Sequence, residues 1–366
     1  TPIIPMILVN GSKGIGTGFS TDIMCYNPIT IMDYVERSIH NEADKPKLVP
    51  YYEGFKGTIS PVTDTGTKWL FKGCYEIISS KEVRVTELPV GTWTDDYKKY
   101  IEDLIEGDTK TTAAAKDKDK AKKKKKSAPS VVRDYTDMST DVTVDITIKF
   151  AGNEIEKLRA KETEYGCNAL EKLLKLYTTR TTTNMHVFDE TEKLRKFETP
   201  EDLIDHYIGV RMKTYVVRKQ HQVGVLEREA MVLSNKARFI TEVLDDTLDL
   251  RRKKKDVVCA ILAKSGYDVI DEDEDFKYLV RLPMDSVTEE NVERIMKEKE
   301  SKLAELKKLK ATTEHQMWLQ EIGTLREAYE GYKKTRAVLQ VTKIKVAKKA
   351  AKKVKKKVVD KGSTKE

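Results

Sequence analysis

A glycine-rich stretch near the N-terminus has residue types that could hold phosphate groups. It reads VNGSKGIGTGFS over residues 9–20. Because glycine has no Cβ, the backbone N–H groups of such a stretch can approach a ligand closely. Three interpretations compete: a turn that cradles the pyrophosphate of a dinucleotide, a tight turn with a purely structural role, and a loop that contacts nucleic-acid phosphates. No alternation of strands and helices follows the glycines, which disfavours the first interpretation.

The other residues that could do chemistry are scattered. The four cysteines form no CxxC pair, and the five histidines stand apart from one another. We therefore predict no metal site and no disulfide framework, which is typical of a reducing intracellular compartment. Aspartates alternate in the acidic stretch 271–275, which we interpret as a solvated loop.

Charge is distributed unevenly along the chain. The net charge is +8, but residues 341–366 alone contribute +9 and residues 108–127 contribute +6, so the rest carries about −7. Lysine-rich stretches of this kind usually stay disordered and bind polyanions by releasing counterions. We predict a flexible insertion at 108–130 and a disordered basic tail at 337–366. No apolar run approaches the length that crosses a membrane.

In the first half of the chain, the sequence predicts both helices and strands to position these residues. A helix over 28–40 would place Ile31, Tyr34, Val35 and Ser38 on one face. The remaining expectations are an antiparallel pair of strands within 57–93, a helix from Asp95 to near Gly107, a half-buried strand over 141–150, a helix over 153–177, and strand or loop over 178–189.

Long helices dominate the second half. One begins at Thr199-Pro200, with Thr199 as N-cap. Its expected core positions are Leu203, Tyr207, Val210, Thr214, Val217 and His221. Another begins near Ser286, with Val292, Met296, Lys299, Leu303, Leu306 and Lys310 in the same spacing. The two suggest an antiparallel coiled-coil arm, although an ordinary helical bundle stays open. The insert between them should hold a helix over 256–265 and a strand over 276–283.

Several motifs occur in the order found in one protein family. The chain resembles the type IIA DNA topoisomerases of eukaryotes and viruses, whose pattern I-P-x-x-P-M-x-L-x-N-G-x-x-G-I-G-T-G-W/F-S matches residues 2–20 from its first proline onward. The similarity covers roughly residues 1–336, so chance is a poor explanation. Its further motifs are FKGTI (55–59), ELPVGTWT (87–94), NMHVFD (184–189) and NKARFI (235–240).

The resemblance implies an α+β fold in four parts. Residues 1–30 would end a DNA-bending segment, and residues 31–198 would form a β-rich tower domain. Residues 199–336 would form the coiled-coil arm, with a small globular exit gate at about 256–290. The basic tail would follow.

The resemblance also implies which residues contact DNA. Ile4, held between Pro2 and Pro5, would wedge between base pairs of the cleavable duplex and bend it. The turn beside the DNA backbone would comprise Asn10, Gly11, Ser12, Lys13 and Gly14. Lys56 and Trp93 would contact DNA from the tower. The gate between two subunits would use Ile261, Leu262, Leu279, Val280 and Leu282.

The function implied is part of an ATP-dependent type II topoisomerase that breaks one duplex, passes a second through and reseals. The partners would be double-stranded DNA, a second copy of the chain, and upstream ATPase, metal-binding and tyrosine-bearing domains. Mg²⁺ and ATP would serve the parent enzyme. Because the resemblance implies that the tyrosine and the metal-binding domain lie upstream, we expect a fragment of a longer protein that has no catalytic residue and is inactive alone. It would act in the nucleus or at a viral replication site. The alternative is a non-enzymatic, chromosome-organising protein with a coiled-coil dimerisation arm.

Overall fold

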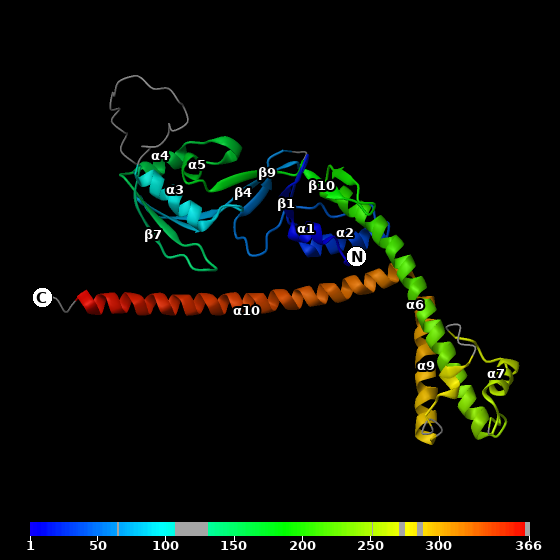
Figure 1. Ribbon diagram of the computed structural model, residues 1–366. Helices are drawn as coiled ribbons and strands as arrows, with labels where there is room; N and C mark the ends of the chain where they lie inside the picture. Colours follow the sequence, from blue (N-terminus) through cyan, green and yellow to red (C-terminus); the bar gives the residue numbers. More distant parts are fainter. Residues whose placement is uncertain (64–65, 107–130, 251, 271–274, 284–287, 363–366) are drawn as a thin grey trace. The chain divides into compact units, whose positions relative to one another are not determined.

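The chain is a mixed α/β protein that forms two compact units. The body unit comprises Pro2–His206 and the chain from Thr324 onward, and the inserted unit comprises Thr1 and Tyr207–Gly323. The computed structural model describes side chains of the last helix only as far as residue 341. The described residues (Figure 1) are 1–63, 66–106, 131–250, 252–270, 275–283 and 288–362. The lysine-rich stretch 108–127 and most of the acidic stretch lie outside them.

The body unit begins with a short helix, a hairpin and a longer helix: α1 (Met6–Asn10), β1 (Ser12–Ile15), β2 (Ser20–Ile23) and α2 (Pro28–Ile39). Asn27 caps α2, because its side chain accepts a hydrogen bond from the N–H of Ile29 at 3.0 Å. Pro28 suits the first helical position, where no N–H is needed. Ile31 and Val35 are fully buried, so the helix predicted over 28–40 and its inward face are confirmed.

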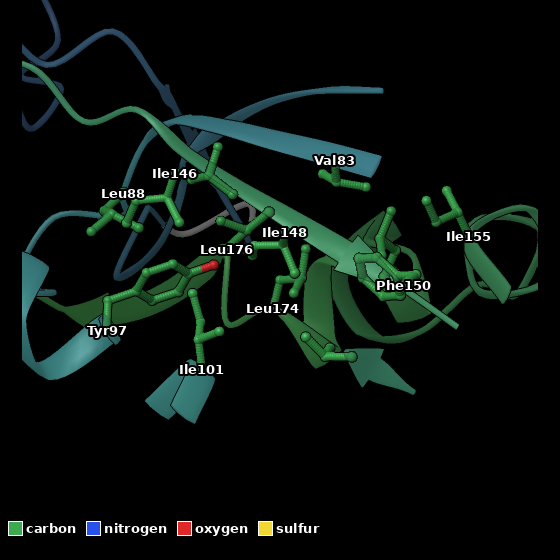
Figure 2. Packing of buried hydrophobic residues seen from close by; sticks show 13 residues of the cluster. Val83, Leu88, Tyr97, Ile101, Ile146, Ile148, Phe150, Ile155, Leu174 and Leu176 are labelled. Carbon is green, nitrogen blue, oxygen red and sulfur yellow. The ribbon is translucent and has the colours of Figure 1, made fainter. Parts of the chain in front are cut away.

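An antiparallel sheet forms the main core of the body unit, with strand order β5-β6-β8-β7. In register, Val83 lies opposite Ile148 and Val85 opposite Ile146. Figure 2 shows Tyr97 packed with this cluster, and all these side chains are buried. The strands are β5 (Cys74–Ser79), β6 (Glu82–Glu87), β7 (Val132–Asp137) and β8 (Ile146–Phe150); helices α3 (Thr94–Glu106), α4 (Glu154–Ala160) and α5 (Ala169–Leu173) contribute to the core.

The strand predicted over 141–150 is shorter than its alternating pattern. Only Ile146–Phe150 is a strand, while Val142 lies in the connection from β7 and is 36% exposed. The N–H of Met138 donates to the carbonyl of Asp145 at 2.8 Å, which closes this connection. The predicted strand is too long because the alternation of apolar and polar residues continues into the loop between β7 and β8.

A smaller antiparallel sheet has the order β3-β4-β9, and β10 pairs with β11 in a separate hairpin. The helix predicted over 153–177 is wrong as a single element. It breaks into α4, a short 3-10 turn η1 (Glu164–Gly166) and α5, because Tyr165 and Gly166 have φ of 61° and 67°. The strands are β3 (Thr58–Pro61), β4 (Lys68–Lys72), β9 (Tyr177–Thr181), β10 (Met185–Phe188) and β11 (Leu194–Phe197).

Long helices build the inserted unit. The expected N-cap at Thr199 is confirmed, since its hydroxyl accepts a hydrogen bond from the N–H of Asp202 at 3.1 Å. Helix α6 runs antiparallel to α9, because Lys310 pairs with Glu227 at 2.6 Å and Lys302 with Glu229 at 3.1 Å. The helices are α6 (Pro200–Leu244), α7 (Lys255–Lys264), α8 (Lys277–Val280), α9 (Glu289–Ala311) and the start of α10 (Glu314–Gly362).

The predicted core positions of these two helices are partly wrong. Val217 is 64% exposed, whereas Tyr215, two residues earlier, is buried. Met296 and Leu303 are exposed on α9, while Ile295 packs against Ala237 and Ile240 of α6. The inward stripe is therefore displaced from the predicted one by one or two residues.

Two further expectations are wrong. The strand predicted over 276–283 contains the short helix α8, because Phe276 and Leu279 are spaced to share one side of a helical turn and both are buried. The tail predicted to be disordered from residue 337 continues as α10 to Gly362. Lysine and alanine both favour helix, and residues 337–361 contain no glycine or proline.

Helix α10 returns the chain to the body unit. The guanidinium of Arg326 donates to Asp33 at 2.7 Å and to Glu36 at 2.8 Å, both on α2. The hydroxyl of Tyr329 donates to the Glu53 carboxylate at 3.2 Å. The body unit is therefore assembled from the two ends of the described chain.

Candidate nucleic-acid interface

The glycine-rich stretch folds into the hairpin β1–β2. The expected turn at Asn10–Gly14 is wrong, because Asn10 ends α1 and Ser12–Ile15 is a strand. The turn lies further on, where the N–H of Gly16 donates to the carbonyl of Phe19 at 2.8 Å. Residues Lys13 to Gly18 are all exposed.

Gly11 joins α1 to the hairpin in a conformation that other residues avoid. Its φ is 67° and its ψ is 173°, a region populated almost only by glycine. An added Cβ would lie 2.8 Å from the carbonyl oxygen of Ile23 and 2.9 Å from the Cys25 sulfur. Burial raises the pKa of the Cys25 thiol, and this thiol donates to the Asn10 carbonyl at 3.2 Å. The base of the hairpin is therefore tightly packed.

Gly11→Ala should lower the free energy of unfolding of the body unit by about 2–4 kcal/mol, from backbone strain and overpacking. Gly14→Ala is the matched control, because nothing lies within 4 Å of its added Cβ. That control should stay within about 0.5 kcal/mol of the parent. Chemical denaturation followed by circular dichroism measures both, and equal stabilities would contradict the packing described at Gly11.

The structure exposes one isoleucine of this region and buries another. Ile15, at the end of β1, is 94% exposed, whereas Ile4 is 3% exposed. An apolar wedge must reach the bases, so the burial of Ile4 argues against the role expected for it. Pro5 is buried and Pro2 is exposed. Sequence reasoning missed Ile15, although an isoleucine between two glycines is a poor core residue and could have been noticed.

The side chain of Lys13 is exposed, and the carboxylate opposite it is paired with another residue. Lys13 lies opposite Asp22 in the strand register. Asp22, however, forms an ion pair with Arg180, whose guanidinium also donates to the Tyr52 hydroxyl at 2.7 Å. Since Asp22 is already paired and Lys13 is exposed, the Lys13 ammonium can attract a phosphate.

A second motif of the family pattern, NMHVFD (184–189), lies directly beside the hairpin. The side-chain amide of Asn184 donates to the Ser20 hydroxyl at 2.9 Å, and the backbone carbonyl of Asn184 accepts the N–H of Asp22 at 2.8 Å. The rings of Phe19 and Phe188 meet edge to face with centroids 5.8 Å apart. Figure 1 shows β1 and β10, whose motifs are more than 160 residues apart in sequence, in the same part of the body unit.

Lys56 and Trp93 lie on separate loops of the body unit. Lys56 is exposed, and its backbone N–H lies 3.4 Å from the Glu87 carboxylate. Trp93 is 76% exposed, and its carbonyl accepts the N–H of Tyr97 at the start of α3. Both side chains are thus accessible to a ligand.

The residues expected at a dimer contact are mostly occupied within the inserted unit. Leu262 and Leu279 are fully buried in one cluster with partly buried Ile261. Leu282 packs on a second cluster with Ile295. Only Val280 is strongly exposed, at 48%. The apolar residues cluster as predicted, but most of them form the insert's own core.

Neither a metal site nor a membrane span is found in the described part of the chain. No group of three or more His, Cys, Asp or Glu side chains there could hold a metal ion. Asp275, the one described member of the acidic stretch, pairs with Lys255 at 2.5 Å and with Lys277 at 3.5 Å. The hydrogen bond from Lys255 lowers the pKa of the Asp275 carboxyl. No described helix is both long and apolar enough to cross a bilayer.

Comparison with known proteins gives consistent matches. The family model that describes the A subunits of DNA gyrase and topoisomerase IV matches residues 1–323. DNA topoisomerase 2 of Plasmodium falciparum (isolate K1 / Thailand) is 33% identical over 90% of this chain and 24% of its own length. DNA topoisomerase 2 of Drosophila melanogaster is 31% identical over 95% of this chain and 26% of its own length.

One solved structure is similar throughout most of the chain. It is the crystal structure of the Plasmodium falciparum topoisomerase II DNA-binding, cleavage and re-ligation domain. The TM-score is 0.75 at 32% identity, over 92% of this chain and 45% of that one. The chain spans about a quarter of the length of the curated relatives named above.

Proposed function

Because this chain belongs to the family of the DNA gyrase and topoisomerase IV A subunits, and thus to the type IIA DNA topoisomerases, we propose that it is part of an ATP-dependent enzyme that passes one duplex through another. Its share of the work is to bind and bend the cleaved duplex and to join two subunits. The observation that carries the proposal is the exposed Ile15 at the end of a glycine hairpin, beside the exposed Lys13. The alternative of a non-enzymatic chromosome-organising protein has no counterpart among the named relatives.

The hairpin binds DNA by combining a cation with an apolar wedge. Lys13 contacts a phosphate, and the neighbouring glycines let the backbone come close to the duplex. Ile15, in place of Ile4, enters a base step and unstacks it, which bends the duplex. Lys56 and Trp93 contact the flanks, Lys56 through phosphate and Trp93 through its exposed ring.

The larger divisions follow the same proposal. The sheets within 31–198 form the tower, and the antiparallel helices within 199–336 form the arm. The insert at 256–290 forms the exit gate, with exposed Val280 at the contact and the buried leucines supporting it. We also propose that the Mg²⁺, the ATP and the nucleophilic tyrosine belong to other domains of the parent enzyme. The enzyme acts on DNA in the nucleus, or at a viral replication site.

We expect the chain to be a dimer at tens of micromolar, and Val280→Asp to shift it towards monomer. A new carboxylate at a symmetric contact would face its own copy and repel it. Val217→Asp is the matched control, because Val217 is an exposed valine of the same unit outside the insert. Sedimentation measures the mass, and a monomeric parent chain would contradict the gate assignment.

The same preparation should relax no supercoiled plasmid on a gel, because positioning without a nucleophile or metal transfers no phosphoryl group.

A further inference from the structure

The hairpin that carries Ile15 needs support from outside itself. It is two-stranded, and its strands have four residues each; Gly14 lies in β1, and Gly16 and Gly18 lie in the turn. An isolated two-stranded hairpin is at best marginally stable, and glycines loosen it further. A wedge on such a hairpin would swing with its tip and would meet the duplex in many orientations.

Phe19 provides the first part of that support. Its ring lies against the backbone of Gly16, since an added Cβ at Gly16 would be 2.9 Å from the Phe19 ring. Gly16 directly follows Ile15 in the chain. The ring of Phe19 therefore fixes the residue next to the wedge.

Phe188 provides the second part, from a distant segment of the chain. Its ring meets the Phe19 ring edge to face, at 5.8 Å between centroids and an interplanar angle of 88°. This is a favoured geometry for two aromatic rings. Phe188 is 58% exposed, so it is no ordinary core residue. A large apolar side chain at such an exposed place is explained by the ring that it holds.

The strand that carries Phe188 is itself tied to the hairpin. At the other end of the segment, Asn184 bonds both the Ser20 hydroxyl and the backbone of Asp22. The ring of His186 lies within hydrogen-bond distance of the Asn184 side-chain oxygen, at 2.9 Å, which orients the amide. Polar contacts from Asn184 to β2 and the aromatic contact from Phe188 to Phe19, just before β2, therefore hold the hairpin at two places.

We propose that Phe188 is a positioning residue for DNA bending, which acts through Phe19 to hold the Ile15 hairpin in one orientation. The inference rests on the proposed function, because it assumes that Ile15 is the wedge. It assigns Phe188 no contact with the reacting atoms. The brace consists of Asn184, Phe188 and Phe19.

The test uses the full-length enzyme that contains this chain, with Phe188→Leu as the main variant. Energy transfer across an end-labelled duplex should show the ratio of bent to straight DNA falling roughly three- to tenfold, the range expected from one lost aromatic pair. Phe188→Tyr keeps the ring and should restore bending. Leu194→Ala is the matched control, since Leu194 is the 42% exposed cross-strand partner of Phe188 and should leave the ratio unchanged.

Two further measurements separate this inference from its premise. Without DNA, hydrogen exchange of residues 12–20 should quicken in Phe188→Leu and not in Leu194→Ala; unchanged exchange overturns the brace. In an Ile15→Ala background, Phe188→Leu should have no additional effect on bending. An undiminished effect there would mean that Phe188 contacts DNA itself, and it overturns the positioning role. Normal bending by Ile15→Ala alone overturns the proposed function of the hairpin, whatever the exchange result.

Discussion

Ile15→Ala should remove most of the bending of a bound duplex while changing its affinity little. Unstacking a base step costs a few kcal/mol, and an apolar side chain in the gap compensates for it. Alanine is too short to fill that gap. A loss of about 2 kcal/mol corresponds to a roughly thirtyfold drop in the ratio of bent to straight duplex. Affinity should persist because phosphate contacts dominate it.

Energy transfer between the ends of a labelled duplex measures the bend, and a titration of the same duplex measures affinity. Ile4→Val is the control, because Ile4 is 3% exposed and loses only one buried methylene. That change should cost stability of about 0.5–1.5 kcal/mol without altering the bend. A bend that depends on Ile4 and not on Ile15 would restore the role first expected for Ile4.

Glu321→Ala should destabilise the inserted unit by about 3–5 kcal/mol, the usual cost of leaving a buried charge without its partner. Arg211 is 5% exposed, and its guanidinium lies 3.6 Å from the Glu321 carboxylate. Arg218 also pairs with Glu321, at 2.6 Å, and the Tyr215 hydroxyl donates to it. Burial, together with the hydrogen bond to Glu321, raises the pKa of Tyr215 to about 12. One carboxylate thus satisfies three side chains of α6.

Urea denaturation followed by tryptophan fluorescence measures this loss, because Trp318 is buried against Tyr215 in the same unit. The matched control is Glu227→Ala. Glu227 pairs with Lys310 at 2.6 Å, but both side chains are about half exposed. An exposed pair contributes at most about 1 kcal/mol. Similar losses in the two variants would show that burial of Arg211 does not set the cost.

Local signals in the sequence predicted the starts of helices better than their facing sides. Thr199 and Pro200 mark the beginning of α6 because capping chemistry is local. The inward stripe could not be read in the same way. Near Tyr215, α6 faces Trp318 of α10, whereas near Ala237 it faces Ile295 of α9. A repeat extrapolated from the first turns therefore fails when the partner helix changes.

The candidate site shows the same limit. The family pattern located the segment from Pro2 to Ser20, but it could not tell which isoleucine is accessible. Ile4 and Ile15 both stand beside residues that restrict or loosen the backbone, and only tertiary packing buries the first and exposes the second. The contact between Phe19 and Phe188 was also invisible, since no local rule pairs residues so far apart.

The pairing of Arg326 with Asp33 and Glu36 has a consequence for synthesis on the ribosome. These partners are 293 and 290 residues apart in the chain. Chains emerge N-terminus first, so α2 waits for its partner while the whole inserted unit is translated. At roughly 5–20 residues per second the delay is about 15–60 seconds. A nascent chain stalled before Arg326 would contain all the described strands of the body unit and would still lack the part of α10 that pairs with α2.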